Sequence, residues 1–122
     1  MTSFPRYVDT IGNTPLLDIT SLVKSPKAGV RILGKAEFMN PGFSMKDRIV
    51  HHILSRALQD GKIQPGGTVV CASSGNTGAS VAMIGAILGL KALIITSPKC
   101  SNEKMSATVS YTHLTLPTIL LV

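Results

Sequence analysis

The sequence predicts an α/β fold of three layers (αβα), in which a mostly parallel sheet lies between helices. Three stretches, 30–38, 68–72 and 92–96, have the apolar or alternating character of strands and end at turns. Each is followed by a helix signal, either apolar residues at helical spacing or a capping residue. Strands and helices that alternate in this way favour parallel pairing with right-handed crossovers.

The first helix is predicted between Ser44, which can cap it, and the turn at 60–61. Its expected apolar face consists of Ile49, Val50, Ile53, Leu54, Ala57 and Leu58. A second helix, 76–88, would present the apolar residues Val81, Met83, Ile84, Ile87 and Leu88. A third helix would begin at Ser101, which can also act as a cap.

The polar loop 73–78 is the clearest candidate binding site, because it joins a strand to the start of a helix. Unpaired N–H groups and the positive end of the helix dipole make such a loop suitable for an anion. The loop 40–44 would follow another strand of the same sheet, so both loops are expected at its carboxyl edge. Neither nucleotide-binding glycine pattern is present, so nucleotide binding by those routes is unsupported. The hydroxyls, carboxamide and two glycines of the loop suit a carboxylate or a phenolate oxygen. A capping cluster that binds only water is the alternative.

Lys46 is the second candidate functional residue. It would lie in the first turn of a helix, where the helix dipole disfavours a cation. An amine that its site desolvates, or surrounds with positive potential, is a better nucleophile than a free lysine. The alternative is a surface lysine that pairs with Asp47 or Asp60.

Composition limits the classes of function. The chain of 122 residues carries a formal net charge of +6, but its 12 Lys and Arg residues form no run of three, which is typical of a solvated surface. With 4% aromatic residues and no Trp, nucleic-acid binding is disfavoured. The two cysteines and the adjacent His51 and His52 match no disulfide framework or metal site. No leader peptide or membrane span is indicated, so a cytoplasmic protein is expected.

Four motifs in order resemble the signatures of the pyridoxal-phosphate enzymes of the cysteine synthase and cystathionine β-synthase family. They are Ile-Gly-Asn-Thr-Pro-Leu at 11–16, Asn-Pro-Gly-Phe-Ser-Met-Lys-Asp-Arg at 40–48, Ser-Ser-Gly-Asn-Thr-Gly at 73–78 and Ser-Pro-Lys-Cys-Ser-Asn-Glu-Lys-Met at 97–105. The resemblance implies a fold-type II pyridoxal-phosphate enzyme, with a fold similar to that of the tryptophan synthase β subunit, present here incompletely.

The resemblance also implies a role for each site residue. Lys46 would form the internal Schiff base with pyridoxal 5'-phosphate, and Asn76 would hydrogen-bond the ring hydroxyl oxygen of the cofactor. Ser73, Ser74 and Thr77, with backbone amides of the loop such as that of Gly75, would bind the α-carboxylate of the substrate. Phe43 is a departure, because the family usually has a second glycine there, and it adds bulk beside the lysine.

The activity implied is β-replacement on an activated serine, with sulfide or a thiol as the incoming group. Cysteine synthase (O-acetylserine sulfhydrylase) is the leading expectation, and a homodimer is expected of the complete enzyme. The alternatives are a cystathionine β-synthase or another lyase of this family, and, from another class, a non-catalytic fragment or binding module.

The resemblance divides the chain into three parts. Residues 1–42 would belong to the larger domain of a complete enzyme, and residues 43–107 to the smaller domain. The stretch 109–119 resembles the translation of a sequencing adapter, so we expect residues 108–122 to be a non-native tail, with an edge strand or a frayed end as the alternative. The family's phosphate-binding loop and its partner of the pyridine nitrogen have no counterpart in the chain, which would then be the opening portion of an enzyme. Such a chain is expected to be marginally stable or prone to aggregate, since its last predicted strand would lack a neighbour.

Overall fold

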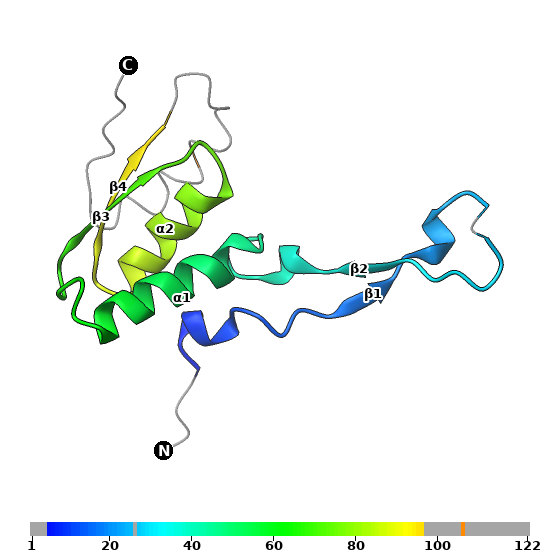
Figure 1. The fold of residues 1–122 in the computed structure, drawn as a ribbon, viewed down its shortest axis with the longest axis horizontal. Helices are drawn as coiled ribbons and strands as arrows, with labels where there is room; N and C mark the ends of the chain where they lie inside the picture. The colour runs from blue at the N-terminus through cyan, green and yellow to red at the C-terminus, as the bar shows by residue number, and fades with distance from the viewer. Residues whose placement is uncertain (1–4, 26, 97–105, 107–122) are drawn as a thin grey trace.

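The structure is a computed structural model that describes residues 5–25, 27–96 and 106 (Figure 1). Its strands are β1 (Leu16–Asp18), β2 (Leu33–Lys35), β3 (Thr68–Ala72) and β4 (Lys91–Ile95). Its α-helices are α1 (Lys46–Gln59) and α2 (Asn76–Ile87), and single 3-10 turns lie at Tyr7–Thr10, Thr20–Leu22 and Glu37–Met39. The helices, β3 and β4 form one body, from which β1 and β2 extend as a long arm (Figure 1).

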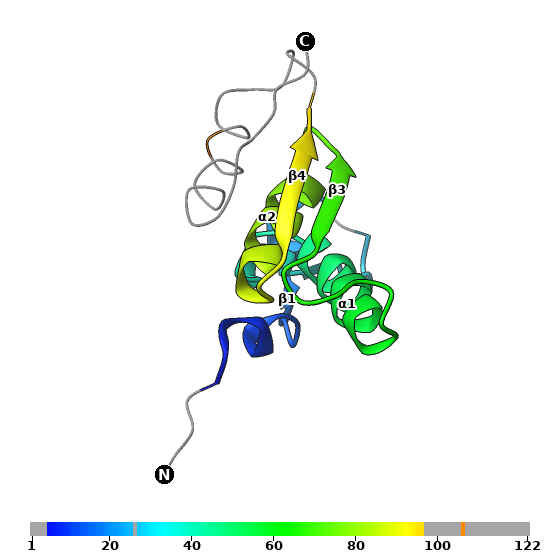
Figure 2. The ribbon, with the colours of Figure 1, turned by 90° about the vertical axis from the view of Figure 1, so that its left-hand side faces the viewer.

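The body is built on the parallel pair β3 and β4, joined by α2 (Figure 2). Thr68 aligns with Lys91 and Ala72 with Ile95, which confirms the predicted parallel pairing. The core contains Val50 and Leu54 of α1, most of α2 and the α2-facing side of β4, with Ile84 fully buried. α2 therefore packs against both α1 and the sheet, and its N-terminus lies at the carboxyl end of β3.

The prediction for the stretch 30–38 is confirmed only in that a strand forms within it; its length and its place in the parallel sheet are wrong. Only Leu33–Lys35 forms a strand, and it pairs antiparallel with β1 in a separate two-stranded sheet. A period of two does not distinguish parallel from antiparallel pairing, and the partner, residues 16–18, is too short to give a strand signal of its own. The loop 40–44 consequently does not follow a strand of the parallel sheet, whereas the loop 73–78 does.

The start and the outer face of α1 also differ from the prediction. The helix begins at Lys46, and the Ser44 hydroxyl accepts a hydrogen bond from the Lys46 N–H (3.2 Å) without occupying the N-cap position, which belongs to Met45. Of the predicted apolar face, Val50 and Leu54 are buried, but Ile49 and Ile53 remain about half exposed. α1 packs on α2 along only one side.

Other expectations concern parts of the chain that are not described. The helix predicted from Ser101 and the stretch 108–122 both lie outside the described residues. Within the described ranges, no helix has the length and apolar character needed to cross a membrane.

Candidate active site

The loop after β3 leaves hydrogen-bond donors open at the start of α2. The backbone N–H groups of Asn76 and Thr77 make no hydrogen bond with any part of the chain that the structure describes. Asn76 is exposed and Thr77 half-buried. A Cβ atom built on Gly75 would meet nothing within 4 Å, so the space beside the helix end is open. Two free amides at the positive end of a helix dipole are suited to bind a carboxylate.

Ser73 holds this loop in shape. Its Oγ accepts hydrogen bonds from the N–H groups of Gly75 (3.3 Å) and Gly78 (3.2 Å), and its own N–H donates to the carbonyl of Ile95 on β4 (2.9 Å). A hydroxyl has two acceptor positions and one donor, so the O–H of Ser73 is still available to a ligand. The serine thus acts as a cap and retains one donor for binding.

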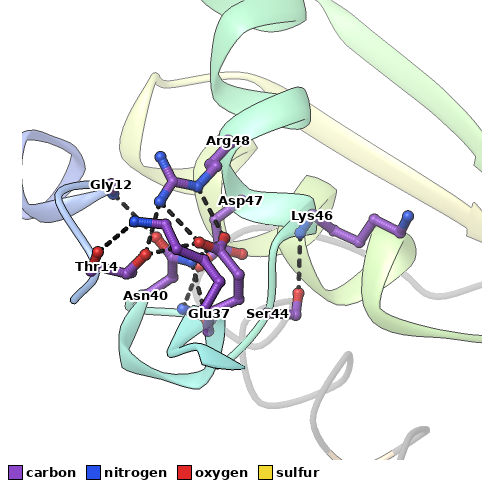
Figure 3. Close-up of polar contacts among 10 residues, drawn as sticks. Gly12, Thr14, Glu37, Asn40, Ser44, Lys46, Asp47 and Arg48 are labelled. Carbon is purple, nitrogen blue, oxygen red and sulfur yellow. Dashed lines mark hydrogen bonds and ion pairs between the residues drawn. The ribbon is translucent and has the colours of Figure 1, made fainter. Parts of the chain in front are cut away.

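Lys46 is the first residue of α1 and is half-buried. Its ammonium group makes no ion pair or hydrogen bond within the described residues, and Figure 3 shows its side chain extending away from the neighbouring polar cluster. The pairing considered for a surface lysine is not formed. Asp60 pairs with Arg56 and Lys62 at the far end of α1, and Asp47 accepts hydrogen bonds from other groups.

Asp47 connects three segments around Lys46. Its carboxylate is fully buried and accepts hydrogen bonds from the N–H of Gly42 (2.5 Å) and from the Oγ of Ser80 on α2 (2.6 Å). Ser80 follows Asn76 by four residues on the same helix, so the two share a face of α2. Lys46 and the open end of α2 are therefore brought to the same region of the molecule.

A second polar cluster, which we call the Glu37 clamp, lies on the other side of the same turn and consists of Thr14, Glu37, Asn40 and Arg48 (Figure 3). Arg48 donates from Nε and Nη2 to the two carboxylate oxygens of Glu37, at 2.8 Å each. Arg48 also donates to the hydroxyl of Thr14 (2.9 Å), which donates in turn to Glu37 (2.7 Å). Bidentate pairs of this kind are the stronger class of ion pair.

The clamp fixes the first motif against the start of α1. Asn40 donates to the side chain of Glu37 (3.0 Å) and accepts from the N–H of Gly12 (2.9 Å), while Lys35 donates to the carbonyl of Thr14. The hydrogen bonds from Arg48, and then from Thr14, lower the pKa of Glu37 from 4.5 to about 2. Glu37 therefore stays ionised in acid and keeps the clamp closed.

Sequence reasoning missed the clamp and the Asp47–Ser80 contact. Thr14, Asn40, Asp47 and Arg48 all lie inside the quoted motifs, and this is the signal that pointed to them. What the sequence could not supply is the pairing, because Ser80 and Asp47 lie 33 residues apart and Arg48 and Thr14 lie 34 apart. Glu37 lies outside the motifs and has no sequence signal of its own.

Comparison with known proteins identifies the family. A family model described as pyridoxal-phosphate dependent enzyme matches residues 7–116. The chain is 42% identical over 98 residues to a cysteine synthase of Dictyostelium discoideum, covering 80% of this chain and 25% of that protein. It is 40% identical over 102 residues to a cystathionine beta-synthase of Apis mellifera, covering 84% of this chain and 20% of that one.

Solved structures agree with these relatives. A cysteine synthase from Entamoeba histolytica superposes with a TM-score of 0.86 at 32% identity, covering 98% of this chain and 35% of that one. An O-acetylserine dependent cystathionine beta-synthase from Helicobacter pylori superposes with a TM-score of 0.79 at 27% identity, covering 99% of this chain and 39% of that one. The chain thus spans between a fifth and two fifths of the length of these proteins. Its fold is that of the fold-type II enzymes, as predicted, and the chain belongs to the family of pyridoxal-phosphate dependent enzymes.

Proposed function

We propose that this chain provides the reactive lysine and the substrate loop of an enzyme that makes cysteine by β-replacement on an activated serine such as O-acetylserine. The observation that supports the proposal most directly is the juxtaposition of an amine without a partner in the described chain with the open donors of α2. Asp47 and Ser80 connect the segments that carry them.

The residues present fit pyridoxal phosphate. The aldehyde of this cofactor requires a primary amine, which Lys46 offers, and the exposed carboxamide of Asn76 can donate to a ring oxygen. The open space at Gly75 lets a planar ring approach the loop backbone. When bound, the cofactor supplies an electron sink for the electron pair released at the α-carbon of an amino acid.

The residues of the chain would divide the remaining work. The free N–H groups of Asn76 and Thr77, with the O–H of Ser73, would bind the substrate carboxylate and orient the α-carbon. Ser74 and the amide of Gly75 complete this loop. The amine of Lys46, once released from its bond to the cofactor, would accept the α-proton at Nζ. Departure of the β-substituent, addition of sulfide at the β-carbon and return of a proton from Nζ to the α-carbon would then complete the replacement.

The second candidate is a cystathionine β-synthase, in which an amino-acid thiol replaces sulfide. The specific observation in its favour is that curated relatives of both names match at similar identity, 42% and 40%. Assays that supply O-acetylserine or serine with either sulfide or an amino-acid thiol distinguish the two. We also propose, from the family resemblance, that the working enzyme is a cytoplasmic homodimer.

Reductive trapping tests the role of Lys46. The chain is mixed with pyridoxal phosphate, reduced with borohydride, and digested so that mass spectrometry can locate the label. We expect the label chiefly on Lys46, and a visible absorbance before reduction that Lys46→Ala abolishes. Lys62→Ala is the matched control, since Lys62 is exposed at the far end of α1 and pairs with Asp60. Equal labelling of all lysines in the unaltered chain would contradict the proposed role.

A further inference from the structure

Asp47, the residue after Lys46, forms a side-chain hydrogen bond with α2. Its carboxylate is completely buried and accepts one hydrogen bond from the loop before α1 and one from Ser80 of α2. Ser80 itself is 1% exposed. Burying a carboxylate is costly unless its oxygens are hydrogen-bonded, so both contacts constrain where the first turn of α1 can lie.

The loop side of this contact is equally constrained. A Cβ atom at Gly42 would collide with both carboxylate oxygens of Asp47, the second at 2.9 Å. The φ angle of Gly42 is not positive, so glycine is required here by space and not by backbone conformation. The turn before Lys46 is therefore shaped to let the Asp47 carboxylate approach the backbone.

We propose that Asp47 is a positioning residue that sets the place of Lys46 relative to the carboxylate-binding end of α2. The inference rests on the proposed function for the chemistry that Lys46 performs. Asp47 and Lys46 are consecutive in the first turn of α1, so their side chains diverge by about 100°. Because the Asp47 side chain is directed at Ser80, the Lys46 side chain points in a different direction around the axis of α1. The Glu37 clamp, through Arg48, holds the same turn by a second set of contacts.

The first test measures how selectively Lys46 is labelled by pyridoxal phosphate and borohydride, relative to the exposed Lys24. Ser80→Ala removes one hydrogen bond and fits the buried space, and we expect it to lower the Lys46 to Lys24 ratio about fivefold, the equivalent of one net hydrogen bond. Asp47→Ala removes both contacts and should lower the ratio about tenfold or more. Circular dichroism checks that each variant keeps its helices.

Asp47→Asn separates positioning from charge. An asparagine can accept from Gly42 through its oxygen and donate to the Ser80 hydroxyl through its amide, so both contacts survive without the charge. We expect it to retain the ratio within about twofold, since neither hydrogen bond is lost. Asp60→Ala, at the exposed far end of α1, should leave the ratio unchanged. If Asp47→Asn were as damaging as Asp47→Ala, or if Ser80→Ala had no effect, the proposal would be wrong.

A second measurement needs no cofactor and separates this proposal from the proposed function. Amide hydrogen exchange is followed in the segments 43–48 and 76–80 of the unaltered chain and of Ser80→Ala. We expect exchange to rise in both segments together, while the segment 55–60 at the other end of α1 is unaffected. If Lys46 is not labelled selectively but the two segments still respond together, the proposed function fails and the connection through Asp47 stands. Independent responses of the two segments would overturn the connection.

Discussion

Two polar regions of the molecule use their hydrogen-bonding groups in opposite ways. In the Glu37 clamp, the guanidinium, hydroxyl and amide groups all donate hydrogen bonds to the carboxylate of Glu37, and the guanidinium also donates to the hydroxyl. In the loop 73–77, Ser73 shapes the backbone and the next helix begins with two N–H groups that bond to nothing described. A closed cluster contributes rigidity, whereas a rigid element with open donors has groups left to bind a ligand.

The turn between the two regions is where we expect the largest effect on stability. Gly42→Ala would press a methyl group against the Asp47 carboxylate. The carboxylate cannot move away without losing its hydrogen bond from Gly42 or from Ser80. We expect it to lower the free energy of unfolding by about 2 kcal/mol, as overpacking in a tight interior does. Chemical denaturation measures the change.

Gly75→Ala is the matched control for that variant. No atom lies within 4 Å of a Cβ built there, and its φ of −139° is accessible to alanine. We expect a change within about 0.5 kcal/mol, and of either sign. A loss at position 75 as large as that at position 42 would show that the collision with Asp47 is not the cause.

The pH dependence of stability should report on the clamp. The pKa of Glu37 is lowered to about 2, first by Arg48 and then by Thr14, so its stabilising contribution is present above pH 4.5. It is lost as the pH falls from 4.5 towards 2, because the unfolded chain binds the proton first. Glu37→Gln should therefore make the fall of Tm with acid shallower in that window.

Two other carboxylates contribute to the same acid range and provide the control. The pKa values of Asp9, beside Arg6, and of Asp18, hydrogen-bonded by Thr20, are also lowered. Both are exposed, so salt should weaken their contribution to the pH dependence of stability more strongly than it weakens that of Glu37. The difference in acid dependence of Tm between Glu37→Gln and the unaltered chain should therefore persist at high salt. If the two chains lost Tm with acid equally steeply, the role of the clamp would be contradicted.

Ser73→Ala should have a smaller effect on stability than Gly42→Ala. It removes the oxygen that accepts from Gly75 and Gly78, and losing such a capping interaction costs about 1 kcal/mol. Ser73→Thr retains the hydroxyl and should recover most of the loss in thermal melts. If Ser73→Ala has the same Tm as the unaltered chain, the hydroxyl of Ser73 does not hold the loop in shape.

The parallel body of the fold could be predicted closely from sequence, and the arm could not. The strand 68–72 and the first residue of α2 are confirmed as predicted, and β4 is shifted by one residue. These elements have strong local signals, namely a continuous apolar run, a polar loop and a helical repeat. β1 and β2 have three residues each, and their partnership depends on contacts distant in sequence.

The candidate site divides in the same way. Lys46 and the loop 73–77 could be found from local pattern and resemblance, and their roles stay predictions. The clamp and the Asp47–Ser80 contact join side chains that are unremarkable singly, and only the fold shows which of them meet. Aggregation of the chain likewise stays a prediction, although Leu16, Leu17 and Leu33 on the arm are all more than 40% exposed.

Phe43 provides the smallest expected effect and the finest test of the turn between the two regions. Its φ of +58° lies in the left-handed region, which favours the glycine that the resemblance implies for this position, and the residue is 76% exposed. Phe43→Gly should raise the free energy of unfolding by about 0.5–1 kcal/mol, since relief of the left-handed strain exceeds the entropy cost of glycine. Phe43→Ala bears the same strain and should differ little from the unaltered chain. Equal stabilisation by both variants would attribute the effect to the exposed ring and not to the backbone.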